Sequence, residues 1–405
     1  MMKCGLLGRK LGHSYSPQIH SYLGDYPYVL FEKEPEELEE FLRDGDFSGI
    51  NVTVPYKKDV IPYLDELTPT AQKMGAVNTI IRRNGRLIGH NTDYFGFLTM
   101  VRSSGLSVAG KKALVLGSGG ASNTAVAVLE ELGANVIVIS RSGVNNYDNL
   151  HIHTDAVLLV NTTPVGMFPH TGSSAVNLDD LPNLEGVLDV IYNPARTKLL
   201  LDAEQRGQVT MNGLLMLVAQ AKEAAEWFTG NPIDDAMIGY IHSKLKQQME
   251  NIILIGMPGC GKSTVAQALG KALGRNVRDS DTLAAELAGM PIPEIFSKFG
   301  EDVFRGHETS ALQTLGMQSG LVLATGGGCV TRDRNYPLLH QNGTIFWLKR
   351  DLNILPTDGR PLSQANSLEK MYQIRKPLYE QFADHIIDNN GSIEETLAQI
   401  LEVLA

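Results

Sequence analysis

Residues 251–263, NIILIGMPGCGKS, decide the fold of the C-terminal part of this 405-residue chain. The apolar, mostly β-branched run at 251–255 predicts a buried strand, and 256–263 then matches the phosphate-binding pattern G-x-x-x-x-G-K-[ST] in full. The residues that follow, STVAQALGKAL, predict a helix over 263–273. A strand, a glycine loop and a helix in this order are the context that the pattern requires. We therefore predict a P-loop nucleotide-binding domain that begins near residue 251.

A second glycine loop, LGSGGAS at 116–122, lies between a predicted strand at 112–116 and a predicted helix at 121–132. Its glycines would let backbone amides approach a pyrophosphate at the helix N-terminus. The pattern is incomplete, because Ser122 stands at the third glycine position, so an ordinary glycine-rich turn remains an alternative. The expected dinucleotide contacts are Gly117, Ser118, Gly119, Gly120 and Ala121.

The end of the next predicted strand, 135–139, bears on cofactor choice. An NAD enzyme places a carboxylate there for the ribose 2′-hydroxyl, whereas this chain has Ser140, Arg141 and Ser142. Arg141 can pair with a 2′-phosphate, which favours NADP(H), although a solvated charge at a strand end is the alternative. Only 18 residues separate Ser142 from Asn161. That interval is too short for a crossover helix and a strand, so we expect the adenosine side of this domain to be reduced.

Predicted strands alternate with predicted helices along the whole chain, which favours an α/β fold with mainly parallel sheets. Further predicted strands lie at 49–54 and 156–160. A helix predicted over 232–248 runs into the strand at 251 with no Gly/Ser/Pro-rich linker, so we place a domain boundary near residue 250.

Composition excludes several classes of function. The net charge is −10, and the acidic excess holds in both parts, with 21 basic and 28 acidic residues in 1–250 and 14 and 17 in 251–405. Neither part predicts a nucleic-acid partner. No apolar run of 18 residues occurs, so no membrane span is expected. Three cysteines without paired spacing (Cys4, Cys260 and Cys329) fit a cytoplasmic enzyme. The sequence does not indicate an oligomeric state.

Eight segments in order over about residues 1–248 resemble the shikimate dehydrogenase family. They are GLLGRKLGHSYSPQIH, GINVTVPYKKDV, GAVNTI, GHNTDYFGF, the glycine loop, NTTPVGM, DVIYNP and NGLLMLVAQAKEAAEWF. The resemblance implies NADPH-dependent reduction of 3-dehydroshikimate to shikimate. It implies a catalytic pair, Lys57 and Asp93. It further implies substrate contacts at Ser14, Ser16, Asn51, Thr53, Asn78, Tyr192 and Gln220, and a nicotinamide side lined by Thr162, Val190 and Gly213.

The residue types suit this chemistry. Hydride addition to a ketone needs a proton donor beside the developing alkoxide, and a lysine oriented by a carboxylate can supply it. Taken alone, Lys57 would be a surface lysine beside Lys58, and Asp93 would be a helix N-cap. The surrounding motifs favour the functional interpretation of both.

Downstream of the P-loop, the segments DSD (279–281), GEDVFRGHE (300–308), ATGGGCV (324–330), DGRPLSQ (358–364) and IRKPLYEQFA (374–383) resemble shikimate kinase. The resemblance implies ATP-dependent phosphorylation of shikimate, with Lys262 and Arg360 on the transferred phosphoryl group and Asp281 as the base. Mg²⁺ would be bound by Ser263 and Asp279, and the nucleotide by Gly259, Cys260, Gly261, Lys262, Ser263 and Thr264. Substrate contacts would be Arg305, Gly326, Gly327, Gly328 and Arg375.

Each kinase residue has a plainer alternative. The DSD cluster could be a turn, the three glycines a flexible loop, and each arginine a surface residue. Cys260 is either a small residue that fills space within the loop or a redox-sensitive thiol, since a helix N-terminus lowers a thiol pKa.

Together the predictions describe an α/β chain with three domains. Residues 1–100 would form a substrate-binding domain closed by helices at about 214–248, residues 101–213 a Rossmann-like NADP domain, and residues 251–405 a P-loop kinase. The expected cofactors are NADP(H), ATP and Mg²⁺, and the expected partners are the small molecules 3-dehydroshikimate and shikimate. Two alternatives are a quinate/shikimate dehydrogenase fused to a kinase, and a chain in which one half is a regulatory ligand-binding module.

Overall fold

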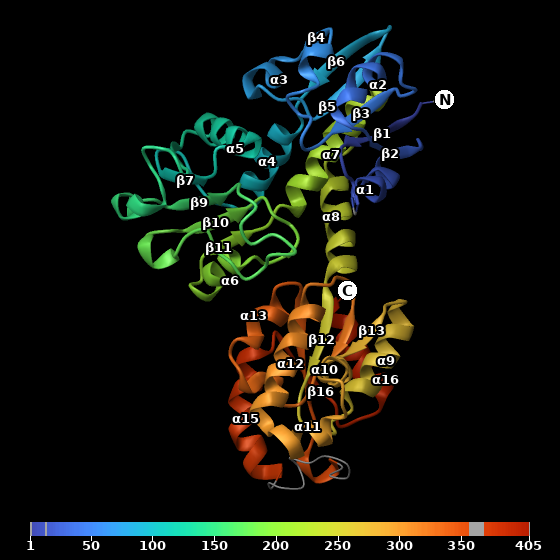
Figure 1. Cartoon of the computed structure of the whole chain (residues 1–405), viewed down its shortest axis with the longest axis vertical. Coiled ribbons are helices and arrows are strands. Elements are labelled where there is room, and N and C mark those ends of the chain that lie inside the picture. Colours follow the sequence, from blue (N-terminus) through green and yellow to red (C-terminus); the bar gives the residue numbers. More distant parts are fainter. Residues whose placement is uncertain (1, 13, 356–367, 405) are drawn as a thin grey trace. The chain divides into compact units, whose positions relative to one another are not determined.

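The computed structural model describes residues 2–12, 14–355 and 368–404 (Figure 1). The chain divides into two compact units. One unit comprises residues 1–165, 174–192 and 202–244, and the other comprises residues 166–173, 193–201 and 245–405. Within the described residues, no helix combines the length and apolar character needed to cross a bilayer.

The N-terminal part of the first unit contains a six-stranded mixed sheet in the order β2-β1-β3-β5-β6-β4. Its first strands pair in parallel, but β5 is antiparallel to both β3 and β6. The β5–β6 hairpin turns at Asn84 and Gly85, whose φ values of 53° and 77° suit a two-residue type I′ turn. The strands are β1 Cys4–Gly8, β2 Tyr28–Glu32, β3 Gly49–Val52, β4 Glu66–Leu67, β5 Thr79–Arg83 and β6 Arg86–His90. The helices here are α1 Ser16–Leu23, α2 Leu38–Asp44, α3 Pro69–Met74, α4 Asp93–Ser103, α7 Leu214–Thr229 and α8 Ala236–Met249.

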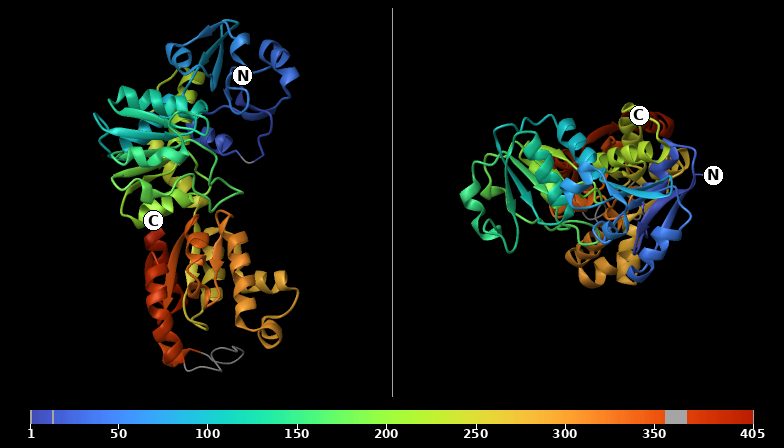
Figure 2. Two further views of the ribbon diagram at one scale, coloured as in Figure 1. Left: turned by 60° about the vertical axis from the view of Figure 1, so that its left-hand side comes forward. Right: turned by 90° about the horizontal axis from the view of Figure 1, so that it is seen from above.

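The second sheet of this unit is parallel, with five strands in the order β11-β10-β9-β7-β8. The strands are β7 Lys112–Leu116, β8 Asn135–Ile139, β9 Leu158–Asn161, β10 Gly186–Asp189 and β11 Val209–Met211, and α5 spans Gly120–Glu131 and α6 Lys198–Gln205. The crossover from β8 to β9 contains only a 3-10 segment, Tyr147–His153, which is kinked at Asn149. The prediction that this interval lacks room for a crossover α-helix is confirmed, and β8 is the edge strand. Figure 2 shows the chain from two further sides.

The second unit contains a parallel five-stranded sheet in the order β13-β14-β12-β15-β16. Its central strand, β12, is the predicted apolar strand, and all five of its residues are buried. The strands are β12 Asn251–Ile255, β13 Val277–Asp279, β14 Val322–Ala324, β15 Gly343–Lys349 and β16 His385–Asp388. The helices are α9 Lys262–Leu273, α10 Ser280–Ala288, α11 Ile292–Phe299, α12 Glu301–Gly316, α13 Asn335–His340, α15 Leu368–Phe382 and α16 Ile393–Leu404.

The connection between α8 and β12 is short. The helix ends at Met249 and the strand begins at Asn251, so Glu250 alone lies between them. This confirms the prediction that no flexible linker precedes the P-loop strand, although the helix begins at Ala236 rather than at residue 232.

Candidate active sites

A cavity of about 300 Å³ in the first unit brings together all nine residues predicted for substrate binding and catalysis in the N-terminal part of the chain. These nine residues lie in or next to α1, β3, β5, α4, β10 and α7, or in the loop that follows β3. The lining residues are Leu6, Ser14, Ser16, Asn51, Val52, Thr53, Lys57, Asn78, Asp93, Ala121, Val190, Tyr192, Gly213, Met216, Leu217 and Gln220. The apolar members Leu6, Met216 and Leu217 were not predicted.

Lys57 and Asp93 form an ion pair in this cavity. Lys57 Nζ lies 2.6 Å from Asp93 Oδ2, and the two side chains are 29% and 16% exposed. Asp93 is the first residue of α4, and its backbone N–H donates to Asn91 Oδ1 at 3.1 Å. A carboxylate at a helix N-terminus is stabilised by the helix dipole. The lysine is therefore held in one orientation beside the cavity.

One polar wall of the cavity is ordered by hydrogen bonds among Asn78, Thr92 and Gln220. Asn78 Oδ1 accepts from the Thr92 backbone N–H at 2.7 Å, and its Nδ2 donates to Thr92 Oγ1 at 3.0 Å. Gln220 Oε1 accepts from Thr92 Oγ1 at 3.3 Å. These bonds fix which end of the Asn78 amide faces the cavity.

Two serines also line the cavity, and the Ser16 backbone N–H donates to Ser14 Oγ at 3.2 Å. Tyr192 meets Tyr15 edge to face, with ring centroids 6.2 Å apart, and burial raises the pKa of Tyr192. The serine hydroxyls and the Tyr192 phenol are neutral hydrogen-bond donors. Such donors suit an anionic, hydroxylated ligand.

The first glycine loop joins β7 to α5. Gly117 has φ 108°, and a Cβ there would lie 2.8 Å from Thr162 Oγ1. At Gly119 and Gly120 a Cβ would meet nothing within 4 Å, so the loop faces open space at the start of a 12-residue helix. This geometry fits a pyrophosphate.

The predicted nicotinamide-side residues Thr162, Val190 and Gly213 lie in different places relative to this cavity. Val190 and Gly213 line the cavity, but Thr162 does not. Its hydroxyl donates to Leu116 O at 2.5 Å and lies beneath the turn at Gly117. Thr162 therefore supports the loop. Arg141 and Ser142 are exposed just past β8, with Ser140 partly buried beside them.

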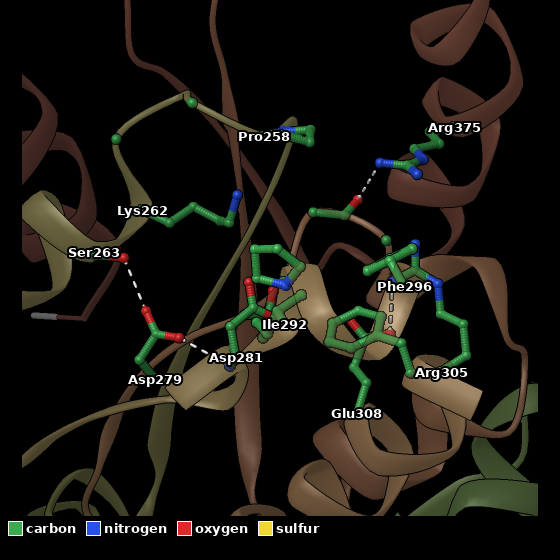
Figure 3. A pocket seen from close by; sticks show the side chains of 18 of the residues that line it. Pro258, Lys262, Ser263, Asp279, Asp281, Ile292, Phe296, Arg305, Glu308 and Arg375 are labelled. Atoms are coloured by element: carbon green, nitrogen blue, oxygen red, sulfur yellow. Dashed lines mark hydrogen bonds and ion pairs between the residues drawn. The ribbon is translucent and has the colours of Figure 1, made fainter. Parts of the chain in front are cut away.

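A larger cavity, of about 660 Å³, lies at the carboxyl ends of the second unit's strands (Figure 3). It gathers most of the predicted kinase residues: Gly259, Gly261, Lys262, Ser263, Thr264, Asp279, Asp281, Arg305, Gly326, Gly327, Gly328 and Arg375. An apolar wall of Ile292, Pro293, Phe296 and Phe304 completes it and was not predicted. Arg360 lies outside the described residues.

The P-loop is held in place by its own lysine. Lys262 Nζ donates to Gly256 O at 2.9 Å and to Met257 O at 3.0 Å. Gly259 and Gly261 have φ values of 84° and 95°, which permit the tight turn. A ring of backbone amides at the start of α9 therefore surrounds the space where phosphates would lie.

Cys260 does not line the cavity. Its side chain is fully buried, and its carbonyl accepts from Asn389 Nδ2 at 2.5 Å. Of the two interpretations left open by the sequence, burial favours the space-filling residue, because a thiol must be accessible to be oxidised readily.

Ser263 and Asp279 form the expected metal-binding pair. Ser263 Oγ donates to Asp279 Oδ2 at 2.9 Å, and Asp279 also caps α10 by accepting from Asp281 N. Hydroxyl and carboxylate oxygens are ligands that Mg²⁺ prefers, and Mg²⁺ usually keeps several waters and phosphate oxygens. The donor set therefore fits Mg²⁺.

Glu308 is a residue that the sequence analysis missed. It is fully buried on α12, and Oε2 accepts from Arg305 at 2.9 Å. A Cβ on Gly326 would collide with both Asp281 Oδ1 and Glu308 Oε1, so the two carboxylates face the same point. The spacing of Arg305 and Glu308, three residues apart on a helix, was the available signal.

Asp281 has a strongly perturbed pKa. Burial, together with the negative charges of Glu308 and Asp279, raises its pKa to about 6. Arg375 donates to Gly327 O at 3.1 Å, and its guanidinium points toward the same cavity as that of Arg305 (Figure 3). The cavity thus combines a titratable carboxyl with two guanidinium groups.

These arrangements define two classes of enzyme on one chain. The first unit has the Lys–Asp pair and dinucleotide loop of an oxidoreductase, and the second has the P-loop, Mg²⁺ ligands and base of a phosphotransferase. Comparisons with known proteins agree. Residues 6–80 match the shikimate dehydrogenase substrate binding domain, and residues 258–405 match shikimate kinase.

The chain belongs to the shikimate dehydrogenase family and carries a shikimate kinase domain in the same polypeptide. The NADP(+)-dependent shikimate dehydrogenase of Clostridium perfringens strain 13 is 36% identical over 264 residues, covering 60% of this chain and 97% of the relative. Shikimate dehydrogenase 1 from Peptoclostridium difficile is 37% identical, with a TM-score of 0.56 over 61% of this chain and 98% of that one. The Thermus thermophilus enzyme, solved with NADP(H) and shikimate, is 31% identical, with a TM-score of 0.54 over 60% and 99%. The chain is thus a bifunctional enzyme with NADP(H), ATP and Mg²⁺ as cofactors.

Proposed function

We propose that the first site reduces 3-dehydroshikimate to shikimate with NADPH and that the second phosphorylates the 3-hydroxyl of shikimate with ATP. The observation that carries the proposal is the Lys57–Asp93 ion pair inside a cavity lined by every predicted substrate contact. The domain limits proposed are 1–100 with 214–248, 101–213 and 251–405.

In the first site, bound NADPH supplies the hydride. Ser14, Ser16 and Tyr192 bind the substrate carboxylate with neutral hydroxyls, and Asn51, Thr53, Asn78 and Gln220 hold the ring oxygens. Lys57 Nζ then gives a proton to the alkoxide oxygen as the carbonyl carbon is reduced. Asp93 keeps the ammonium beside that oxygen. Ala121, Val190 and Gly213 line the side from which the hydride arrives.

The glycine loop and Arg141 would hold NADP(H). The loop amides of residues 117–121 face the pyrophosphate, and Arg141 with Ser140 and Ser142 faces the 2′-phosphate. Thr162, with Val190 and Gly213, would lie on the nicotinamide side, and its hydroxyl also supports the turn at Gly117.

In the second site, bound Mg·ATP supplies the phosphoryl group. Arg305 and Arg375 bind the shikimate carboxylate, and Gly326–Gly328 allow the ring to approach the backbone. Asp281 accepts the proton of the 3-hydroxyl as that oxygen bonds to phosphorus. The amides of 259–264 and Lys262 bind phosphate oxygens, Ser263 and Asp279 hold Mg²⁺, and Arg360 would contact the transferred group.

Three free, buried cysteines support the proposal that the enzyme works in the reducing cytoplasm. The roles assigned above are tested by one assay with 3-dehydroshikimate, NADPH and Mg·ATP, in which NADPH loss and ADP release are followed separately. ADP should appear only after shikimate has formed, and added shikimate should release ADP without NADPH. Rapid turnover of quinate with NAD⁺, or the absence of either the dehydrogenase or the kinase activity, would contradict the assignment.

A further inference from the structure

Tyr28 lies behind the first cavity and does not line it. It stands on β2, at the edge of the first sheet beside β1. Its phenol donates to Asn51 Oδ1 at 2.8 Å. Asn51 is 5% exposed and lines the cavity, so the phenol approaches a proposed substrate contact from the protein side.

The Asn51 amide uses both of its ends in this arrangement. While Oδ1 accepts from Tyr28, Nδ2 donates to Thr79 Oγ1 at 3.2 Å and lies 3.4 Å from Asn78 O. The two ends of an amide have nearly the same shape, so their orientation is decided by hydrogen-bond partners. Both side chains that hold the amide, Tyr28 at Oδ1 and Thr79 at Nδ2, lie outside the cavity lining.

The phenol is itself held rigidly. His20 stacks on Tyr28, with ring centroids 4.0 Å apart and an interplanar angle of 13°. Burial lowers the pKa of His20 to about 3, so this ring stays neutral, and its Nδ1 lies 2.8 Å from the Tyr26 hydroxyl. Burial also raises the pKa of Tyr28 well above its ordinary value, while a hydrogen bond with the Ser16 side chain acts in the opposite direction. Tyr28 therefore remains a protonated donor at working pH.

We infer that Tyr28 is a positioning residue for the dehydrogenase site: its phenol fixes the Asn51 amide and thereby the recognition of the substrate ring hydroxyl. Tyr28 also contacts Ser16, a second proposed substrate contact. The inference rests on the proposed function of this site.

The test is Tyr28→Phe, which removes the hydroxyl and keeps the stacked ring. The KM for 3-dehydroshikimate should rise roughly three- to tenfold, because a net hydrogen bond to a positioned group is lost. The KM for NADPH should stay unchanged, and kcat should stay within about twofold, since Lys57 and Asp93 are untouched. A general loosening of the fold would instead lower kcat and the thermal unfolding temperature.

Tyr26→Phe is the matched control. It removes the other phenol of the same cluster, which binds His20 and does not itself contact Asn51, so the KM for 3-dehydroshikimate should change far less than in Tyr28→Phe. In an Asn51→Ala background, the effect of Tyr28→Phe should shrink to what its contact with Ser16 contributes, because the main residue through which it acts is gone. An unchanged KM in Tyr28→Phe, equal effects of the two phenol variants, or additive effects with Asn51→Ala would each overturn the inference. Failure of the wild-type chain to reduce 3-dehydroshikimate would instead overturn the proposed function.

Discussion

The two sites of this chain treat their charged groups in opposite ways. In the dehydrogenase site, Lys57 and Asp93 satisfy each other at 2.6 Å before any substrate is present. In the kinase site, Asp281 Oδ1 and Glu308 Oε1 are buried and have no hydrogen-bond partner among the described residues. Two carboxylates face each other there, although the other oxygen of Glu308 pairs with Arg305, whereas the dehydrogenase site holds an ion pair.

The difference follows from the chemistry. A proton donor must be held beside a carbonyl oxygen, and a fixed carboxylate does this at little cost in a half-buried place. A base that must take a proton from a hydroxyl works better when its pKa lies closer to neutrality, which burial and a neighbouring carboxylate achieve. The first site is therefore complete in its polar contacts, whereas the second has contacts that its ligands must supply.

The largest expected effect is in Lys57→Ala. Because the proton donor is removed, kcat for NADPH oxidation should fall by on the order of 10²–10⁴. Phosphorylation of added shikimate by the same preparation serves as the control and should be unchanged. Near-wild-type reduction by this variant would show that Lys57 is not the proton donor. The ion pair of the dehydrogenase site would then have no catalytic role to compare with Asp281.

Asp281→Asn is the matching change in the other site. An amide cannot take the hydroxyl proton, so kcat for ADP release should fall by on the order of 10²–10³ while reduction of 3-dehydroshikimate continues. Binding of shikimate, followed by equilibrium dialysis, should remain measurable because Arg305 and Arg375 are intact. Retained phosphorylation would show that positioning alone suffices and that the raised pKa has no catalytic use.

Much of both sites could be predicted from the sequence because local patterns carry them. The P-loop at 256–263 and its flanking strand are continuous in the sequence, and the structure places them as expected. The shortened interval between Ser142 and Asn161 predicted a missing crossover helix by length alone, and the structure has a 3-10 helix there.

Contacts between distant segments could not be predicted, for physical reasons. Thr162 follows a strand next to the glycine loop, and the sequence does not show that its hydroxyl turns back to Leu116 O. Tyr28 acts across 23 residues on Asn51, and such a contact depends on strand order rather than on spacing. The β5–β6 hairpin, in contrast, had a local signal in Asn84-Gly85 that favours antiparallel pairing.

Glu308→Gln tests how the kinase base is tuned. Since the Glu308 charge helps to raise the pKa of Asp281 to about 6, its removal should lower that pKa. The acid limb of kcat/KM for shikimate, which reports the free enzyme, should move to lower pH. Dehydrogenase kinetics should not change.

Glu301→Gln is the matched control for that variant. Glu301 also pairs with Arg305, at 2.8 Å, and is not among the groups that shift the pKa of Asp281. It should therefore weaken shikimate binding modestly without moving the acid limb. Equal shifts in both variants, or none in Glu308→Gln, would assign Glu308 to holding Arg305 alone.

The smallest expected effect concerns stability, and it separates the two sites most directly. The pKa of Asp281 is about 6 in the folded state against 3.8 as its ordinary value, so the folded state binds the proton more tightly. Stability of the second unit should therefore fall as pH rises from about 4 to about 6, and the whole loss of stability should persist above that range.

Asp281→Asn removes the buried charge. This variant should unfold at a higher temperature than the wild type at pH 7.5, and the difference should vanish near pH 3.5. A gain of roughly 2–4 °C corresponds to about 1 kcal/mol in a domain of this size. The relevant calorimetric transition is the one that Mg·ATP raises in the wild type. Asp93→Asn should give no such gain in the other transition, because it removes the partner of Lys57 rather than a repelled charge. A lower unfolding temperature for Asp281→Asn at pH 7.5, or equal gains in both variants, would end the contrast between an ion-paired site and a charge-strained one.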